Sequence, residues 1–214
     1  MRGTPHVAAL DRAQRAAASR ALVGLLITPA HLTNPSRTTD ARDATRRGAP
    51  RPRLGGMATA TRATALLVRR RVTHTIHAYA HDPRTDGFGE EAARALAVPE
   101  ERLFKTLVAV VDTQLVCAVV PVSGRLSLKA LATALGGKRA DMADPAAAAR
   151  ATGYVIGGIS PLAQRTPLPV VIDSTAPQFA TVFVSAGKRG LQVELAPADL
   201  VDLTSAKVAP IATT

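Results

Sequence analysis

The sequence contains no tryptophan, and only 3% of its residues are aromatic. A protein with so few large rings must build its core from valine, leucine, isoleucine and alanine. Hydrophobic residues still make up 47% of the chain. That share is too high for a wholly disordered polypeptide, so we expect at least one folded domain with a core of small aliphatic contacts.

Cysteine is almost absent as well: Cys117 is the single one, which excludes a framework of disulfides within the chain. It lies inside the apolar run LVCAVV, where a free cysteine usually acts as a small hydrophobic residue. A reactive thiol needs an accessible and electropositive setting. The sequence therefore predicts that Cys117 belongs to the core and is not a nucleophile.

Long hydrophobic runs are missing too. The first apolar run, ALVGLLI at 21–27, has seven residues, and no run approaches the ~18 residues of a transmembrane helix. We therefore expect a cytoplasmic protein without a membrane partner.

The first 56 residues lack both lysine and glutamate but contain ten arginines and three aspartates, a net charge of +7. Residues 57–214 carry the remaining +4 of the total of +11. Proline and glycine interrupt the basic segment, so we expect a low-order extension there. Three interpretations remain open: an early start that precedes the true first residue, Met57; a basic RNA-binding arm; or a targeting segment.

From Met57 onward, the pattern predicts helices that alternate with strands. Helices are expected at 60–71, at 90–98, from a Ser127 cap to Gly136-Gly137, from Asp144-Pro145 onward, and at 199–205. Strands are expected at 73–79, 103–111, 114–122, 154–158, 169–173, 180–185 and 191–196. Hairpins between helices favour one α+β domain with a mixed sheet over residues 57–214.

Several familiar chemistries have no counterpart in the sequence. The segment GGISPL lacks the spacing of a GxSxG nucleophile elbow, and GKRG lacks the serine or threonine of a P-loop. His74 and His77 point to opposite faces of the predicted strand, and no cluster of ligands accompanies His81. The pairs Glu90-Glu91 and Glu100-Glu101 are typical of helix starts. We predict neither a metal nor a cofactor.

Three features could instead form an anion pocket. Lys105 stands in LFKTL, a strand that is otherwise expected to be buried, and it lies either at a solvated strand end or in a pocket as a fixed cation. The segment TGYVIGGISP (152–161) contains paired glycines, which allow close approach of a ligand to backbone N–H groups or simply form a turn. The hairpin tip SAGKRG (185–190) carries Lys188 and Arg189, which are either solvated or bind phosphate.

These segments together resemble a known family. HAYAHDP with FGEEAARAL, FKTLV, the long run LSLKALATALGGKRADMADPAAAARATGYVIGGISPL, and FVSAGKRGLQVELAPADL are similar to the YbaK/EbsC family of Cys-tRNA(Pro) and Cys-tRNA(Cys) deacylases. That family is in turn similar to the editing domain of bacterial prolyl-tRNA synthetases. The resemblance covers about 60–210. It implies a mixed, partly barrel-like sheet flanked by helices, and as partners a mischarged tRNA, bound by its 3′ CCA end, and prolyl-tRNA synthetase.

The resemblance also implies site residues. The family's essential lysine falls on Lys105 and its backbone-donating glycine on Gly157, with Gly158 as a second expected N–H donor. The expected substrate-binding residues are Tyr79, Phe88, Thr106, Ser160, Ser185, Lys188 and Arg189. The sequence departs from the family at Ala186, where some relatives carry glycine, and at Gln192, where some carry aspartate.

The reaction that the resemblance implies is removal of cysteine from misloaded tRNA(Pro). In the mechanism proposed for the family, the cysteine thiol attacks its own carbonyl carbon, so that no protein nucleophile is needed. Two alternatives remain open from the sequence: a non-catalytic module on the same fold that binds tRNA or synthetase, and a deacylase for another small amino acid such as alanine.

Overall fold

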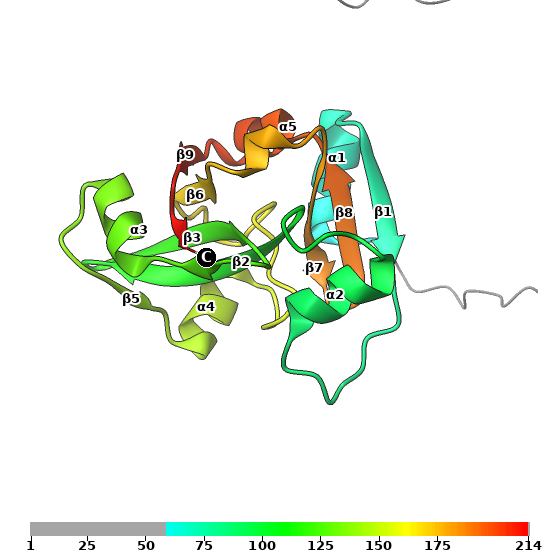
Figure 1. The fold of residues 1–214 in the computed structure, drawn as a ribbon, viewed down its shortest axis with the longest axis horizontal. Helices are drawn as coiled ribbons and strands as arrows, with labels where there is room; N and C mark the ends of the chain where they lie inside the picture. The colour runs from blue at the N-terminus through cyan, green and yellow to red at the C-terminus, as the bar shows by residue number, and fades with distance from the viewer. Residues whose placement is uncertain (1–58, 214) are drawn as a thin grey trace, which may run out of the picture. The chain divides into compact units, whose positions relative to one another are not determined.

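A computed structural model describes residues 59–213, and the predicted extension at 1–56 lies outside these residues (Figure 1). The helices are α1 (Arg62–Arg70), α2 (Phe88–Leu96), α3 (Leu128–Leu135), α4 (Pro145–Thr152) and α5 (Pro197–Thr204), with a short 3-10 helix η1 (Ala176–Gln178). The strands are β1 (His74–Ala78), β2 (Leu103–Val111), β3 (Gln114–Pro121), β4 (Arg125–Leu126), β5 (Ala140–Met142), β6 (Val170–Asp173), β7 (Val182–Lys188), β8 (Leu191–Leu195), β9 (Lys207–Ala209) and β10 (Ala212–Thr213). No helix among the described residues has both the length and the apolar character needed to cross a membrane.

The main sheet is mixed, as predicted. Its strand order is β1-β8-β7-β2-β3-β6-β9, and β5 pairs with β2 outside this path. The predicted hairpin of β2 and β3 is antiparallel, as is the hairpin of β7 and β8. Three strand pairs are parallel: β2–β7 connects the two hairpins, β3–β6 adds β6, and β6–β9 adds β9. A separate small sheet joins β10 to β4.

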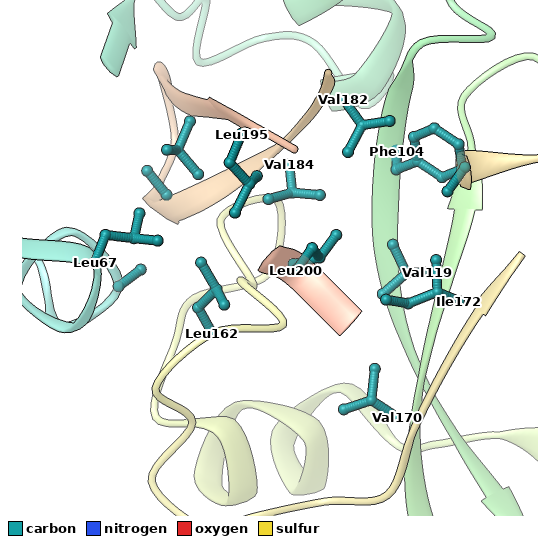
Figure 2. Close-up of a cluster of buried hydrophobic side chains, with 14 of the residues drawn as sticks. Leu67, Phe104, Val119, Leu162, Val170, Ile172, Val182, Val184, Leu195 and Leu200 are labelled. Atoms are coloured by element: carbon teal, nitrogen blue, oxygen red, sulfur yellow. The ribbon is translucent and has the colours of Figure 1, made fainter. Parts of the chain in front are cut away.

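The sheet curves so that its two halves share one core. Figure 2 shows Val184 and Leu195, from the β7–β8 half, in the same buried cluster as Phe104, Val119 and Ile172, from the β2–β3–β6 half. Leu67 of α1 and Leu200 of α5 complete this cluster. The curvature and the flanking helices confirm the α+β fold with a partly barrel-like sheet.

Local capping chemistry explains where two helices begin and end. Ser127 accepts a hydrogen bond from the Ala130 N–H at the start of α3, and Asp144 accepts one from the Ala147 N–H at the start of α4. Gly136 ends α3 with a left-handed conformation at φ 73°. The expected start and end of α3 and the expected start of α4 are therefore confirmed.

The expected strand at 154–158 is wrong. These residues form bends and turns in the loop between α4 and β6. Gly157 has φ 81°, and the Gly158 N–H donates to the Val155 carbonyl at 2.9 Å, which turns the chain back on itself. Val155 and Ile156, which made the segment look like a buried strand, are exposed.

Asp173 joins the end of β6 to the C-terminal strands. Its Oδ1 accepts bonds from the Thr175 N–H (3.0 Å) and hydroxyl (2.7 Å). Its Oδ2 accepts bonds from the N–H groups of Ile211 (2.9 Å) and Ala212 (2.7 Å). Burial alone would raise the pKa of this carboxyl group, but the hydrogen bonds outweigh it and lower the pKa.

Replacing Asp173 by asparagine should therefore lower the free energy of unfolding at neutral pH by about 2–3 kcal/mol. The amide has no charge, and its NH2 group is a donor that would face the donors now bound by a carboxylate oxygen. A lowered pKa stabilises the fold above the ordinary carboxyl pKa, and this contribution disappears as the pH falls through the folded-state value. Denaturant unfolding of both proteins from neutral to acidic pH measures the effect. If the difference in free energy of unfolding between wild type and Asp173→Asn does not become smaller in acid, this role of Asp173 is contradicted.

Candidate active site

A gap along one edge of β2 lies next to a cavity in the described part of the chain. On this edge, β7 pairs with Leu103 and Phe104 only, and β5 pairs with Ala109–Val111 only. The Val108 carbonyl accepts a bond from the Ala143 N–H on the same edge. Successive residues of a strand direct their main-chain N–H and C=O groups to opposite edges, so residues two apart face the same edge. The main-chain N–H and C=O of Thr106 therefore face this edge, as those of Val108 do, between the two partner strands.

A cavity of about 430 Å³ lies over this gap. Its walls come from the loop before α2, from β2, from the start of α4, from the loop after α4 and from the β7–β8 hairpin. The lining residues used below are Asp86, Phe88, Glu90, Lys105, Thr106, Ile156, Gly157, Ser185 and Gln192. The volume is in the range of sites that bind small organic molecules.

Lys105 brings a positive charge to the cavity wall. Its Nζ donates one hydrogen bond, to the Val122 carbonyl at 3.2 Å. No ion pair within residues 59–213 involves Lys105. Since an ammonium group has three donors, two remain for a ligand. The half-buried ammonium thus provides the fixed cation that the sequence left open as one alternative.

Two cavity residues hold buried polar atoms without a partner. Within the described part of the chain, neither Thr106 Oγ1 nor Gln192 Oε1 makes a hydrogen bond. Both residues line the cavity. Because buried polar atoms are nearly always paired in folded proteins, two such atoms at one cavity are typical of a site that a polar ligand completes.

Phe88 and Gly157 form a closely packed corner of the cavity. A Cβ atom on Gly157 would lie 2.7 Å from two carbons of the Phe88 ring, so only glycine allows this contact. Arg189 holds the same ring from the hairpin: its guanidinium lies 5.0 Å from the ring centroid, and its Nε donates to the Ile156 carbonyl at 2.8 Å. The position of Gly157 therefore depends on both neighbours.

Five of the ten residues expected in the site line this cavity: Phe88, Lys105, Thr106, Gly157 and Ser185. The Ser185 hydroxyl accepts a bond from the Gly187 N–H at 3.3 Å, across a bulge in β7.

The other five expected residues lie outside the lining. Gly158 packs against the backbone of Lys188 and Arg189, with a Cβ position 3.0 Å from the Arg189 nitrogen. Its N–H already binds Val155, so the expectation that Gly158 donates to a ligand is not met here. Ser160 is fully buried, and its Oγ accepts from the Leu162 N–H.

Tyr79 belongs to a small core between α2 and the sheet, where it packs among Ala92, Leu103 and Phe183. Burial raises the pKa of its phenol, and the negative charge of Glu91 adds to this effect. Tyr79 is not among the residues that line the cavity, but it packs against Leu103, which is one of them.

Sequence reasoning missed three polar residues of the lining. Gln192 was noted only as a departure from a family pattern, and Glu90 only as a helix-start residue, yet both line the cavity together with Asp86. The sole sequence signal for Gln192 was a polar residue between Leu191 and Val193 in a buried strand. All three of these strand residues are buried.

The described cysteine and histidines do not line the cavity. Cys117 is buried, and burial raises the pKa of its thiol to about 12, which confirms its place in the core. His77 binds Glu194 at 2.9 Å, and His81 binds Glu91 at 2.8 Å. Within residues 59–213, no three histidine, cysteine or acidic side chains are grouped as metal ligands would be.

Comparisons with known proteins identify relatives of this chain. EbsC of Enterococcus faecalis, described as a candidate Cys-tRNA(Pro)/Cys-tRNA(Cys) deacylase, is 41% identical over 125 residues, which are 58% of this chain and 76% of EbsC. The crystal structure of a candidate trans-editing enzyme for prolyl-tRNA synthetase superposes with a TM-score of 0.64 and 26% identity, over 73% of this chain and 98% of that one.

The hypothetical protein APE2540 has the same fold, with a TM-score of 0.65 and 25% identity over 72% of this chain and all of that one. The sequence profile of the aminoacyl-tRNA editing domain matches residues 82–203, which span α2 to α5 and every wall of the cavity. This chain belongs to the aminoacyl-tRNA editing domain family.

Proposed function

We propose that this chain is an enzyme that removes cysteine from mischarged tRNA(Pro), and that prolyl-tRNA synthetase is its partner. The observation that carries the proposal is the cavity over the β2 gap, where the Lys105 ammonium and Gly157 line one space of about 430 Å³. An aminoacyl ester is already reactive, so a site that orients it can accelerate its cleavage.

In this proposal, the cysteinyl ester lies against the open edge of β2. Lys105 neutralises the charge that develops on the carbonyl oxygen, and the Gly157 N–H donates to the same oxygen. The thiol sulfur bonds to the carbonyl carbon, the bond from that carbon to the tRNA 3′ oxygen breaks, and the thiol proton passes to the 3′ oxygen. The products are a cyclic thiolactone, which water then opens, and intact tRNA.

The composition of the cavity supports attack by the substrate's own thiol. Among the described residues that line it, there is neither histidine nor cysteine, and the hydroxyl groups come from Thr106 and Ser185. A serine nucleophile requires an adjacent base, and the one hydrogen bond of the Ser185 hydroxyl within residues 59–213 is to a backbone N–H. The substrate thiol is a better nucleophile than either hydroxyl.

A panel of Cys-, Ala- and Ser-tRNA(Pro) tests the proposal. We expect rapid loss of cysteine and a Ser-tRNA(Pro) ester that survives largely intact, because a hydroxyl is a far weaker nucleophile than a thiol near neutral pH. Release of each amino acid is measured against the uncatalysed rate. Equal rates for serine and cysteine would overturn thiol attack, and rapid loss of alanine alone would reassign the substrate. Binding of tRNA without cleavage of any ester would mean that the chain is a non-catalytic binding module.

A further inference from the structure

A basic strip leads away from the cavity and ends at two neighbouring arginines. Arg62, on α1, and Arg165, in the loop after α4, both approach Gly153. A Cβ atom on Gly153 would lie 2.7 Å from Arg62 Nη2 and 3.1 Å from Arg165 Nε. The two guanidinium groups are therefore direct neighbours, although 103 positions separate them in the sequence.

The fold holds Arg62 firmly in this position. Its Nη2 donates to the carbonyl groups of Thr152 (2.9 Å) and Gly153 (2.8 Å), at the C-terminus of α4. Its guanidinium also lies 4.4 Å from the centroid of the Tyr154 ring. The Arg165 N–H donates to the Thr152 carbonyl at 2.9 Å, which fixes the backbone but leaves the exposed side chain free to turn.

Contacts connect this pair to the cavity. A Cβ on Gly187 would lie 2.5 Å from the Tyr154 ring, so the ring rests on the hairpin of β7 and β8. That hairpin carries Arg189, whose guanidinium lies over Phe88 at the cavity wall. The buried Tyr154 ring and the hairpin thus connect the pair Arg62/Arg165 to Lys188 and Arg189, and these four basic residues make up the strip.

The strip has excess positive charge. None of the ion pairs found within residues 59–213 involves Arg62, Arg165, Lys188 or Arg189. Two adjacent guanidinium groups repel each other unless an anion lies between them. Planar guanidinium groups match the oxygen atoms of a phosphate in a bidentate manner.

We infer that Arg62 and Arg165 bind a backbone phosphate of the tRNA beyond the nucleotide that enters the cavity. This inference rests on the proposed function, because the strip begins at the cavity that would hold the 3′ end. The next charged groups along an RNA strand from that end are its phosphodiesters. This continuity with the cavity favours RNA as the ligand. An acidic protein surface is less favoured, because nothing would place its carboxylates in line with the cavity.

Arg165→Gln tests this site, because the side chain is exposed and its backbone bond does not depend on it. For tRNA(Pro) without an attached amino acid, one lost phosphate contact should make the slope of log Kd against log salt concentration shallower by about 1. At 0.1 M salt, the same loss should reduce kcat/KM for Cys-tRNA(Pro) by about five- to tenfold. Hydrolysis of cysteinyl-adenosine, which lacks these phosphates, should remain at the wild-type rate.

Arg84→Gln is the matched control, because it removes the same charge from a guanidinium that Asp82 already pairs at 3.1 Å. It should leave the salt slope unchanged, while Arg165→Lys should retain most of it. An unchanged slope in Arg165→Gln, or an equal loss with cysteinyl-adenosine, would overturn the inference, as would weaker binding of the synthetase alone. If the wild-type protein cleaves no ester but Arg165→Gln still makes the salt slope shallower, the proposed function is refuted and the phosphate site at Arg62 and Arg165 stands.

Discussion

Lys105→Ala is expected to slow deacylation of Cys-tRNA(Pro) by about 10²- to 10³-fold, the usual loss when one preorganised group at a developing oxyanion is removed. Among the lysines and arginines of the described chain, Lys105 is the one that lines the cavity. Its charge has no acidic partner in an ion pair within residues 59–213. Nothing else in the lining replaces that charge. Single-turnover release of cysteine from Cys-tRNA(Pro) measures the loss.

The way in which the rate falls identifies what Lys105 does. If the ammonium stabilises charge only in the transition state, kcat and kcat/KM fall together; if it binds a ground-state phosphate, KM rises and kcat is retained. Lys129→Ala, on the exposed side of α3, is a control for the loss of one lysine. A Lys105→Ala protein that melts like wild type and deacylates at the wild-type rate would refute the proposed site.

The local elements of the fold were predictable because their signals are local. Ser127 and Asp144 are cap residues whose bonds reach three positions along the chain. The β2–β3 hairpin follows from two β-branched runs around a two-residue connection. In contrast, β5 and β9 have three residues each, and their existence depends on partners far away in the sequence, so no periodicity could reveal them.

The strand prediction at 154–158 was wrong for a different reason. Tyr154, Val155 and Ile156 have high strand propensity, but Tyr154 alone of the three is buried, and its hydroxyl donates to the Leu162 carbonyl within the same loop. Gly157, with its positive φ, then breaks the extended conformation. Propensity was overridden by a loop that serves the cavity and not the sheet.

The site was predictable only in part. Lys105 and Gly157 are 52 positions apart, and no spacing rule places them in one space; the family resemblance did so. The open edge of β2, the unpaired Thr106 Oγ1 and Gln192 Oε1, and the arginine pair at Gly153 required coordinates, because each depends on which distant segment comes close.

Gly157→Ala should be the second large effect. The new methyl group would lie 2.7 Å from the Phe88 ring, and the backbone would keep a φ of 81° that disfavours any side chain. The loop or the ring must move, and a displacement of about 1 Å at a site that works by orientation costs about 10²-fold in rate. The strained backbone should lower the free energy of unfolding by about 1–2 kcal/mol.

Gly136→Ala separates these two effects. Gly136 has a similar φ of 73°, but nothing lies within 4 Å of its Cβ position. It should therefore lose similar stability while it deacylates Cys-tRNA(Pro) at the wild-type rate, because α3 does not line the cavity. Equal activity in both variants would mean that contact between Gly157 and Phe88 has no part in orienting the ester. A deficit confined to Gly157→Ala would tie catalysis to that contact, since backbone strain is common to the pair.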